Sequence, residues 1–265
     1  MRAHGSRRRG LIAAAAALLV IAGFAAVVVV PSSSFTPSEP RAGSLPEGPR
    51  AAFEIPEPEP LRTEGETRWA PVERAVQARS APGGGRRVGR LSTRTPEGTA
   101  NLVVVLGRAR RSAGALWVRV RLPVLPNNTT GWVPRRSLGG YRTVDTRLVV
   151  DREKLTAELF RAGRKVFSTR VGIGEDRWPT PAGRFYVRVK STTYKSPFYG
   201  PLAFGTSARS AVLTDWPAGG FVGIHGTDRP ELLPGRVSHG CIRMRNEAIL
   251  ELGRLMPVGT PVSIT

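Results

Sequence analysis

The chain of 265 residues is long enough for one or two domains with buried cores, and a hydrophobic content of 40% excludes a wholly disordered protein. Its formal net charge of +20 comes mostly from arginine, with 36 Arg against 4 Lys, and such a surface favours anionic partners. No basic stripe interleaved with aromatic residues is present, which disfavours nucleic acid, and the location inferred below favours an anionic cell-wall or membrane surface as the partner.

An uncharged run from Leu11 to Val30 is long enough to cross a bilayer as a helix. Three consecutive arginines precede this run, so the positive-inside rule places residues 1–10 in the cytoplasm. We therefore expect a single-pass transmembrane anchor over residues 11–30, with the remainder of the chain extracytoplasmic. A cleaved signal peptide is the alternative, although the run exceeds the usual length of a signal-peptide core.

Two regions of different composition follow the apolar run. Residues 31–70 are rich in Pro, Ser and Glu, cannot bury a core, and predict an extended linker. Residues 71–140 predict short strands separated by turns, which is typical of a small β domain. The expected elements are a loop at residues 83–85, strands at 102–106 and 117–121, a turn at 127–131, and a strand beginning at Trp132.

From residue 144 to residue 265 the pattern is again mainly β. A hairpin turn is expected at residues 161–164, and apolar and polar residues alternate from Phe185 to Val189. Asn246 is placed to cap a helix that runs to Leu255, with Ile249, Leu250 and Leu252 on its apolar side, and residues 258–264 predict a closing strand. Because strands and helices do not alternate, we expect a mainly β fold with one or two short helices and not a parallel α/β fold.

The only cysteine, Cys241, lies within seventeen residues of His225 and His239, the two histidines outside the N-terminal tail. A thiol is a weak nucleophile until a base removes its proton, and a neutral imidazole is the usual base. Spacing alone does not choose between the two histidines, and a buried, inert Cys is the alternative to a catalytic one. One Cys and two His give too few ligands for a metal site, and no nucleotide motif is present, so we expect no cofactor.

The segments Ile224-His225-Gly226-Thr227 and Ser238-His239-Gly240-Cys241, preceded by Thr180-Pro181-Ala182-Gly183-Arg184-Phe185, resemble the signature of the L,D-transpeptidase (YkuD-type) family over residues 144–265. The resemblance implies that Cys241 is the nucleophile and His225 the base, with His239 beside them. It also implies that the carbonyl of Gly226 orients the base, although Asp228 is an alternative.

The same resemblance implies an oxyanion hole made by the backbone amides of His239, Gly240 and Cys241. Arg243 stands where the family often has Asn, and we expect Ser238, Arg243 and Tyr194 to contact the substrate. The alternative for Arg243 is a solvated surface charge. Aromatic residues that could line the cleft are Phe198, Tyr199 and Trp216.

Within residues 71–140, a Trp-Val pair, a turn and Gly131-Trp132-Val133 resemble the bacterial SH3-like domain. Together the two resemblances imply an enzyme of cell-wall biogenesis that cross-links peptidoglycan stem peptides through a cysteine thioester. They also imply covalent inhibition by β-lactams of the carbapenem type. An L,D-carboxypeptidase that transfers the same acyl group to water, and a non-catalytic wall-binding protein, are the alternatives.

Overall fold

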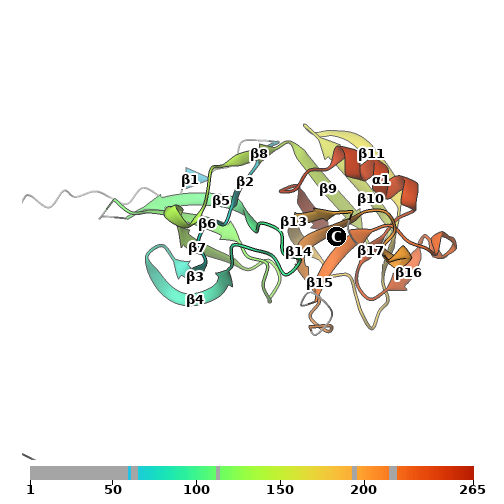
Figure 1. Cartoon of the computed structure of the whole chain (residues 1–265), viewed down its shortest axis with the longest axis horizontal. Helices are drawn as coiled ribbons and strands as arrows, with labels where there is room; N and C mark the ends of the chain where they lie inside the picture. Colours follow the sequence, from blue (N-terminus) through green and yellow to red (C-terminus); the bar gives the residue numbers. More distant parts are fainter. Residues whose placement is uncertain (1–58, 61–64, 112–113, 193–195, 215–219) are drawn as a thin grey trace, which may run out of the picture. The chain divides into compact units, whose positions relative to one another are not determined.

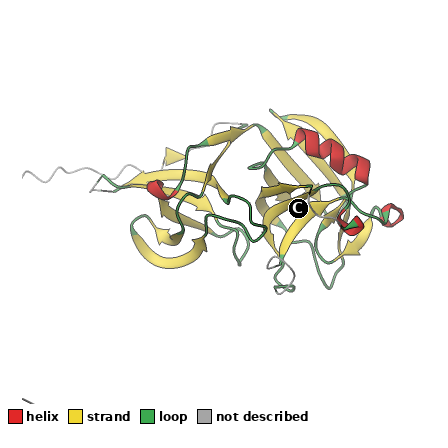
Figure 2. Ribbon diagram, viewed as in Figure 1, coloured by secondary structure: helices red, strands yellow, loops and turns green. Residues whose placement is uncertain are grey.

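The computed structural model describes residues 59–60, 65–111, 114–192, 196–214 and 220–265. Strands dominate these residues, and a single α-helix accompanies them (Figures 1 and 2). Within the described residues no helix has the length and apolar character needed to cross a membrane. The expected tail, the anchor over residues 11–30 and most of the linker lie outside the described residues.

The first sheet is antiparallel throughout, in the order β4-β3-β7-β6-β5-β2-β8, with β1 pairing with β5. Its inner face is filled by small and branched apolar side chains, among them Val103, Val118 and Val133, all fully buried. Its strands are β1 (Glu59–Pro60), β2 (Thr67–Pro71), β3 (Val76–Ala81), β4 (Gly84–Leu91), β5 (Leu102–Arg110), β6 (Leu116–Arg121), β7 (Thr130–Pro134) and β8 (Arg142–Val144).

Several details of this sheet differ from expectation. The expected loop at residues 83–85 is a tight hairpin turn, because Gly84 and Gly85 already belong to β4 and Gly83 supplies the positive φ of 74° that the turn needs. The sheet also extends beyond residues 71–140, since it includes β2 and β8. Short strands such as β8 have too few residues to show a periodic pattern.

The second sheet is mixed, in the order β11-β10-β9-β18-β13-β14-β15-β17-β12-β16. Three of its pairings are parallel, namely β9 with β18, β15 with β17, and β12 with β16. Its strands are β9 (Thr146–Asp151), β10 (Thr156–Arg161), β11 (Arg164–Arg170), β12 (Gly172–Gly174), β13 (Gly183–Ser191), β14 (Ala203–Arg209), β15 (Phe221–His225), β16 (Gly235–Ser238), β17 (Ile242–Arg243) and β18 (Pro261–Ile264).

Strand β13 is buried on both faces, contrary to the expected alternation. All five residues from Phe185 to Val189 are buried, including Tyr186 and Arg188. One face of β13 packs in the core of the second sheet, and Tyr186 on the other face packs against Trp69, Leu102 and Val104 of the first sheet. The apparent polar face of this strand is therefore the side that meets the first sheet.

The expected hairpin is confirmed, because β10 and β11 join through Ala162 and Gly163, both in the left-handed region. The helix α1 (Asn246–Leu255) is also present, and Ile249 and Leu252 enter the core. Two of its details were wrong. Leu250 is 42% exposed, and Asn246 is the first helical residue and makes no side-chain cap. Its Oδ1 instead accepts a hydrogen bond from the backbone N–H of Thr227 at 3.0 Å.

Candidate active site

The parallel pairing of β15 with β17 brings together residues that are eighteen positions apart in sequence. His225 pairs with Arg243, and Ile224 pairs with Ile242, so His225 at the end of β15 lies beside the segment that begins with Cys241. The backbone N–H of Gly223, also on β15, donates to Cys241 Sγ at 3.4 Å. The residues that line the resulting small pocket include Phe198, Tyr199, Phe221, His225, His239, Cys241 and Arg243.

His225 is held as a neutral imidazole with a defined tautomer. Its side chain is 1% exposed, and Nδ1 lies 2.6 Å from the carbonyl oxygen of Gly226, which can only accept a hydrogen bond. Burial lowers the pKa of His225 to about 4, more than the bond to Gly226 raises it. The proton therefore sits on Nδ1, and Nε2, which has no hydrogen-bond partner among the described residues, is left as a basic nitrogen.

The carbonyl of Gly226 occupies the orienting position that Asp228 could have taken. Asp228 is exposed, and its negative charge raises the pKa of His225 less than the hydrogen bond to Gly226 does. The backbone at Gly226 packs closely against Asn246, Gly200 and Pro201 and leaves no room for a side chain. A Cβ at Gly226 would lie 2.3 Å from Asn246 Oδ1, so a side chain there would displace the residue that anchors Thr227.

Cys241 is half-buried and is the free cysteine of the chain. Burial raises the pKa of its thiol, while the N–H of Gly223 and the positive charge of Arg243 oppose that rise. Thiol and imidazole are therefore both neutral near pH 7.

His239 lies on another wall of the pocket and is held by stacking. Its ring stacks on Trp178 with 3.9 Å between the ring centroids, and the guanidinium of Arg177 lies 3.7 Å from the centre of the Trp178 ring. Arg177 is itself tied to Glu175 at 3.0 Å. Trp178 was not among the residues selected from the sequence, where its position two residues before Thr180 was the one available signal.

The turn before Cys241 is fixed by two buried hydroxyl groups. Thr180 Oγ1 donates to the carbonyl of Gly240 at 2.8 Å and accepts a hydrogen bond from the N–H of Gly174. These bonds give the segment that begins at Thr180 a structural role beside Cys241. Ser238 Oγ donates to the carbonyl of Cys241 at 2.6 Å. The φ of 108° at Gly240 is one that side chains rarely adopt, so a glycine is required at this position.

Two expectations for this turn can be compared with its hydrogen bonds. Ser238 is fully buried and its hydroxyl is used within the turn, where it shapes the site, and its contact with a substrate stays a prediction. The N–H of Gly240 donates to Ser238 Oγ at 3.1 Å and is therefore already engaged. Of the three amides expected to form an oxyanion hole, those of His239 and Cys241 remain as candidates.

Arg243 is not a solvated surface residue, because only 6% of it is exposed. Its guanidinium lies 4.4 Å from the centre of the Phe198 ring, and burial lowers its pKa. Phe198 and Tyr199 also approach the His225 ring, with centroid distances of 5.8 and 5.0 Å. The expected aromatic lining is thus present for these two residues, whereas Tyr194 and Trp216 lie outside the described residues.

A further buried cation supports the pocket wall from behind. Arg188 on β13 lies with its guanidinium 4.0 Å from the centre of the Phe221 ring, and Phe221 lines the pocket. Its charge faces Glu97, in the loop between β4 and β5, at an N–O distance of 4.0 Å. A residue in a loop of the first sheet is therefore placed to influence the pocket, and no sequence pattern indicated this contact.

The fold and the pocket together define a β-rich domain in which Cys241 and His225 line the same small pocket. A family model described as the L,D-transpeptidase catalytic domain, YkuD, matches residues 145–264. YkuD of Bacillus licheniformis is 33% identical over 129 residues, which cover 48% of this chain and 71% of that protein. YqjB of Bacillus subtilis is 38% identical over 111 residues, which cover 38% and 58%. Both are named as candidate L,D-transpeptidases.

The chain belongs to the YkuD family of L,D-transpeptidase catalytic domains. Among solved structures, the catalytic domain of an Enterococcus faecium L,D-transpeptidase is 28% identical, with a TM-score of 0.35, and the match covers 45% of this chain and 96% of that one. An L,D-transpeptidase from Mycobacterium tuberculosis is 15% identical, with a TM-score of 0.38 and coverage of 57% and 90%. Since both TM-scores are below 0.5, the family assignment depends on the sequence matches.

Proposed function

We propose that the protein is a peptidoglycan L,D-transpeptidase that uses Cys241 as nucleophile and His225 as general base. The observation that carries this proposal is the hydrogen bond from His225 Nδ1 to the carbonyl of Gly226, together with the low pKa of the buried ring. A neutral imidazole with Nε2 unprotonated, beside a neutral thiol, is the resting state that general-base activation of a nucleophile requires.

In the first half-reaction, Cys241 Sγ attacks the carbonyl carbon at the L-centre of the diamino acid in a tetrapeptide stem. His225 Nε2 takes the thiol proton as the C–S bond forms. It then gives that proton to the nitrogen of the terminal D-Ala, whose C–N bond breaks, and D-Ala leaves. The carbonyl oxygen, which is negative in the tetrahedral intermediate, is stabilised by the backbone amides of His239 and Cys241.

In the second half-reaction, an amine on a neighbouring stem attacks the thioester. His225 removes a proton from that amine and returns it to sulfur as the C–S bond breaks, which restores the thiol and leaves a cross-linked dimer. Arg243, buried against Phe198 at the edge of the pocket, presents a planar fork of donors to a carboxylate of the stem. Water in place of the amine would make the same acyl-enzyme a carboxypeptidase.

The remaining parts of the proposal concern the rest of the chain. The first sheet would be an SH3-like module, and residues 11–30 would anchor the protein in the bacterial cell membrane with its catalytic domain outside. Structural cysteines of exported proteins usually occur in disulfide-bonded pairs. A single cysteine in an extracytoplasmic domain is therefore consistent with a catalytic role for Cys241.

The test is to incubate the full chain with purified tetrapeptide stems and to measure the masses of the products. A transpeptidase gives dimers that have lost one D-Ala. A product mixture of tripeptides alone would replace this proposal with the carboxypeptidase, and unchanged tetrapeptides would favour a non-catalytic wall-binding protein. The Cys241→Ala variant is the control, and it must give no product.

A further inference from the structure

Phe221, the first residue of β15, forms one wall of the thiol pocket and is only half-buried. Its ring lies against two guanidinium groups, with its centre 4.0 Å from Cζ of Arg188 and 5.0 Å from Cζ of Arg209. Arg188 belongs to β13, and Arg209 is the last residue of β14. The position of this wall therefore depends on where these two strands hold their arginines.

The end of β14 loses its regular strand neighbours before the chain reaches Arg209. The pairing of β14 with β13 ends at Thr206, and its pairing with β15 is irregular between Gly205 and Arg209. An irregularity of this kind leaves backbone groups without ladder partners and bends the strand. Arg209 and Phe221, which pair beyond the irregularity, therefore depend on hydrogen bonds from outside these strands.

Such bonds come from Asn127, in the turn between β6 and β7 of the first sheet. Its Nδ2 donates to the carbonyl of Arg209 at 2.7 Å, and its Oδ1 accepts from the N–H of Arg209 at 3.0 Å. One side-chain amide thus satisfies both backbone groups of Arg209, as the next strand of a sheet would.

The direction of these bonds explains the contact between Arg209 and the ring of Phe221. Because both backbone groups of Arg209 point toward Asn127, Arg209 and Phe221 form a non-hydrogen-bonded pair, whose side chains lie close together. One position further on, the N–H of Ser210 donates to the carbonyl of Gly220 at 2.8 Å, as this kind of pairing requires. Asn127 therefore supports the strand pair at the residue that lies opposite Phe221.

Other contacts hold the thiol and the imidazole. His225 lies at the opposite end of β15 from Phe221, and its carbonyl accepts a hydrogen bond from the N–H of Met244 at 2.9 Å. Cys241 Sγ accepts from the N–H of Gly223 at 3.4 Å. A change at the end of β14 should therefore move the wall that a substrate meets more than it moves the reactive pair.

We propose that Asn127 is a positioning residue for the thiol pocket, which acts through Arg209 on the ring of Phe221. The first sheet thereby determines how tightly the pocket binds its substrate and has little effect on the rate of the step at Cys241. Asn127 has this role only if the proposed function holds, because the pocket on which it acts is the one assigned to the stem peptide.

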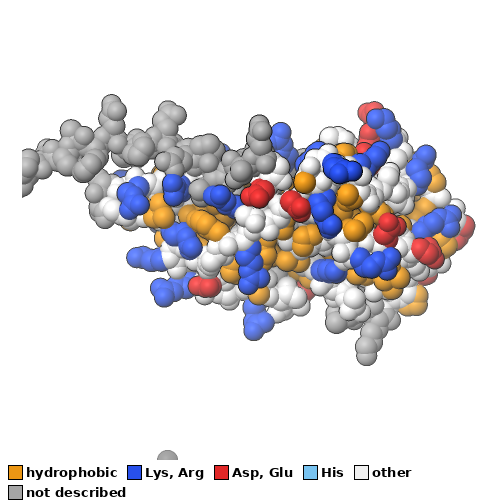
Figure 3. Space-filling view, turned by 90° about the horizontal axis from the view of Figure 1, so that it is seen from above, with side chains coloured by type: hydrophobic (Ala, Val, Ile, Leu, Met, Phe, Trp, Pro, Cys, Tyr) orange, Lys and Arg blue, Asp and Glu red, His pale blue; other side chains and the backbone are white. Residues whose placement is uncertain are grey.

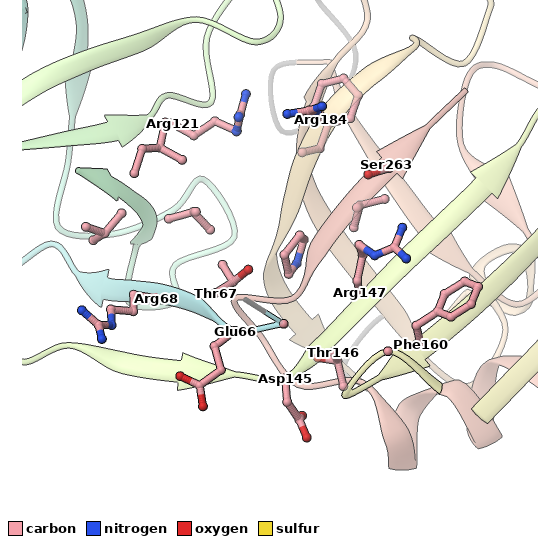
Figure 4. Close-up of a pocket in the computed structure, with 18 residues that line it drawn as sticks. Glu66, Thr67, Arg68, Arg121, Asp145, Thr146, Arg147, Phe160, Arg184 and Ser263 are labelled. Atoms are coloured by element: carbon pink, nitrogen blue, oxygen red, sulfur yellow. The ribbon is translucent and has the colours of Figure 1, made fainter. Parts of the chain in front are cut away.

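The same turn offers a matched control in Asn128. Asn128 Oδ1 accepts a hydrogen bond from the N–H of Arg184 at 2.7 Å, so this residue also joins the turn to the second sheet. Arg184 lines a separate cavity of about 770 Å³, which shares none of its described lining residues with the thiol pocket (Figure 4). Asn128 has a φ of 68°, which glycine adopts without strain, so Asn128→Gly removes this bond and keeps the turn.

Both Asn127→Ala and Asn128→Gly leave the net charge of the protein unchanged. Figure 3 shows Lys and Arg side chains spread over one face of the molecule with few acidic ones, and a basic surface attracts anionic substrates. A variant that altered the net charge would therefore change the affinity for a substrate without any movement of Phe221. The difference between these two uncharged variants reports on the contact with Arg209 instead.

The experiment follows acylation of the full chain by a carbapenem at a series of inhibitor concentrations, which separates the dissociation constant of the first complex from the maximal acylation rate. We expect Asn127→Ala to raise this dissociation constant at least about fivefold and to change the maximal rate by less than about twofold. Asn128→Gly should change both quantities by less than about twofold. A preserved maximal rate also shows that the variants are folded.

Two further measurements separate positioning of the ring from a general loss of structure. Phe221→Ala removes the ring, so adding Asn127→Ala to it should raise the dissociation constant by less than about another twofold. The N–H of Ser210 is bonded to Gly220 and not to Asn127. It should exchange with solvent at least about tenfold faster in Asn127→Ala than in Asn128→Gly if the strand pair has loosened.

Three results would overturn the proposal while leaving the proposed function intact. The first is a dissociation constant in Asn127→Ala equal to that of the parent or of Asn128→Gly. The second is a maximal rate that falls as much as the affinity, or an undiminished effect of Asn127→Ala in the Phe221→Ala background. The third is equal exchange of the Ser210 N–H in the two turn variants. No acylation of the parent protein would instead remove the proposed function, and the role of Asn127 with it.

Discussion

At the scale of single residues, the proposed chemistry depends on the protonation state of His225. Its pKa lies near 4 because the ring is buried, whereas an exposed histidine in the unfolded chain titrates near 6.5. Between these values the unfolded chain binds a proton that the folded protein does not bind, so the free energy of unfolding must fall as the pH is lowered through this window. Above pH 6.5 His225 is neutral in both the folded and the unfolded chain, so the free energy of unfolding keeps its full value there.

The shift corresponds to about 3 kcal/mol of stability lost between pH 6.5 and pH 4. We expect denaturant unfolding at a series of pH values to show this loss in the parent protein and in His239→Gln. In His225→Gln, which has no ring to titrate, the loss in this window should be smaller by about that amount. Parallel pH profiles for the parent and His225→Gln would show that the ring is not held neutral by burial.

Arg243 gives a second prediction at this scale. Arg243→Lys keeps the positive charge but removes the planar guanidinium that packs on Phe198 and its paired hydrogen-bond donors. Arg243→Ala removes the charge, the planar group and the donors. We expect kcat/KM on tetrapeptide stems to fall at least about tenfold in both, and further in Ala, since each charge-assisted hydrogen bond contributes about 1.5–3 kcal/mol. Because Arg243 is buried, the thermal midpoint of Arg243→Ala should also fall.

The control for Arg243 is Arg245→Ala, which changes an exposed arginine two residues further on. It should retain both kcat/KM and the thermal midpoint, because an isolated exposed charge contributes little. If Arg243→Ala keeps full kcat/KM while its midpoint drops, the residue only supports the fold and has no part in recognition.

At the scale of elements, the loop between β4 and β5 should influence a pocket that it does not line. Glu97→Gln removes the charge opposite the buried Arg188, whose guanidinium rests against Phe221. Breaking a buried pair on one side leaves an uncompensated charge, so we expect a loss of about 3 kcal/mol in the free energy of unfolding. We also expect slower acylation of Cys241 as Phe221 shifts.

The measurement is chemical denaturation of the full chain, with acylation by a carbapenem followed in parallel. Glu153→Gln, an exposed residue with no salt-bridge partner among the described residues, is the control and should match the parent. Equal stability of Glu97→Gln and Glu153→Gln would mean that water already screens Arg188 and that the loop is energetically separate from the pocket.

Some secondary-structure elements could be predicted from the sequence, and others could not. The β10–β11 hairpin and α1 were predictable because their signals are local, a turn sequence and a helical period. The parallel pairing of β15 with β17 was not, because it joins short strands through a long connection and leaves no periodic trace. The motif nevertheless named Cys241 and His225. The supports at Trp178 and Arg188 were missed because stacking and buried ion pairs require knowledge of which segments meet.

At the scale of the whole molecule, the N-terminal segment should determine location. The apolar run over residues 11–30 lies outside the described residues, and its role as an uncleaved anchor is a proposal from sequence. We expect the full chain, expressed in a bacterium, to fractionate with membranes and to keep its complete mass. A soluble product that begins near residue 31 would show that the segment is a cleaved signal peptide, and the chemistry at Cys241 would be unaffected.

The central claim is that Cys241 is a nucleophile activated by His225, and the most direct measurement is the intact mass of the protein after exposure to a carbapenem. We expect the mass to rise by that of one inhibitor molecule, peptide mapping to place the addition on Cys241, and Cys241→Ser to show no addition. In His225→Ala the addition should slow by about 10²–10⁴-fold. No addition to the folded parent protein, or equal rates in the parent and His225→Ala, would contradict it.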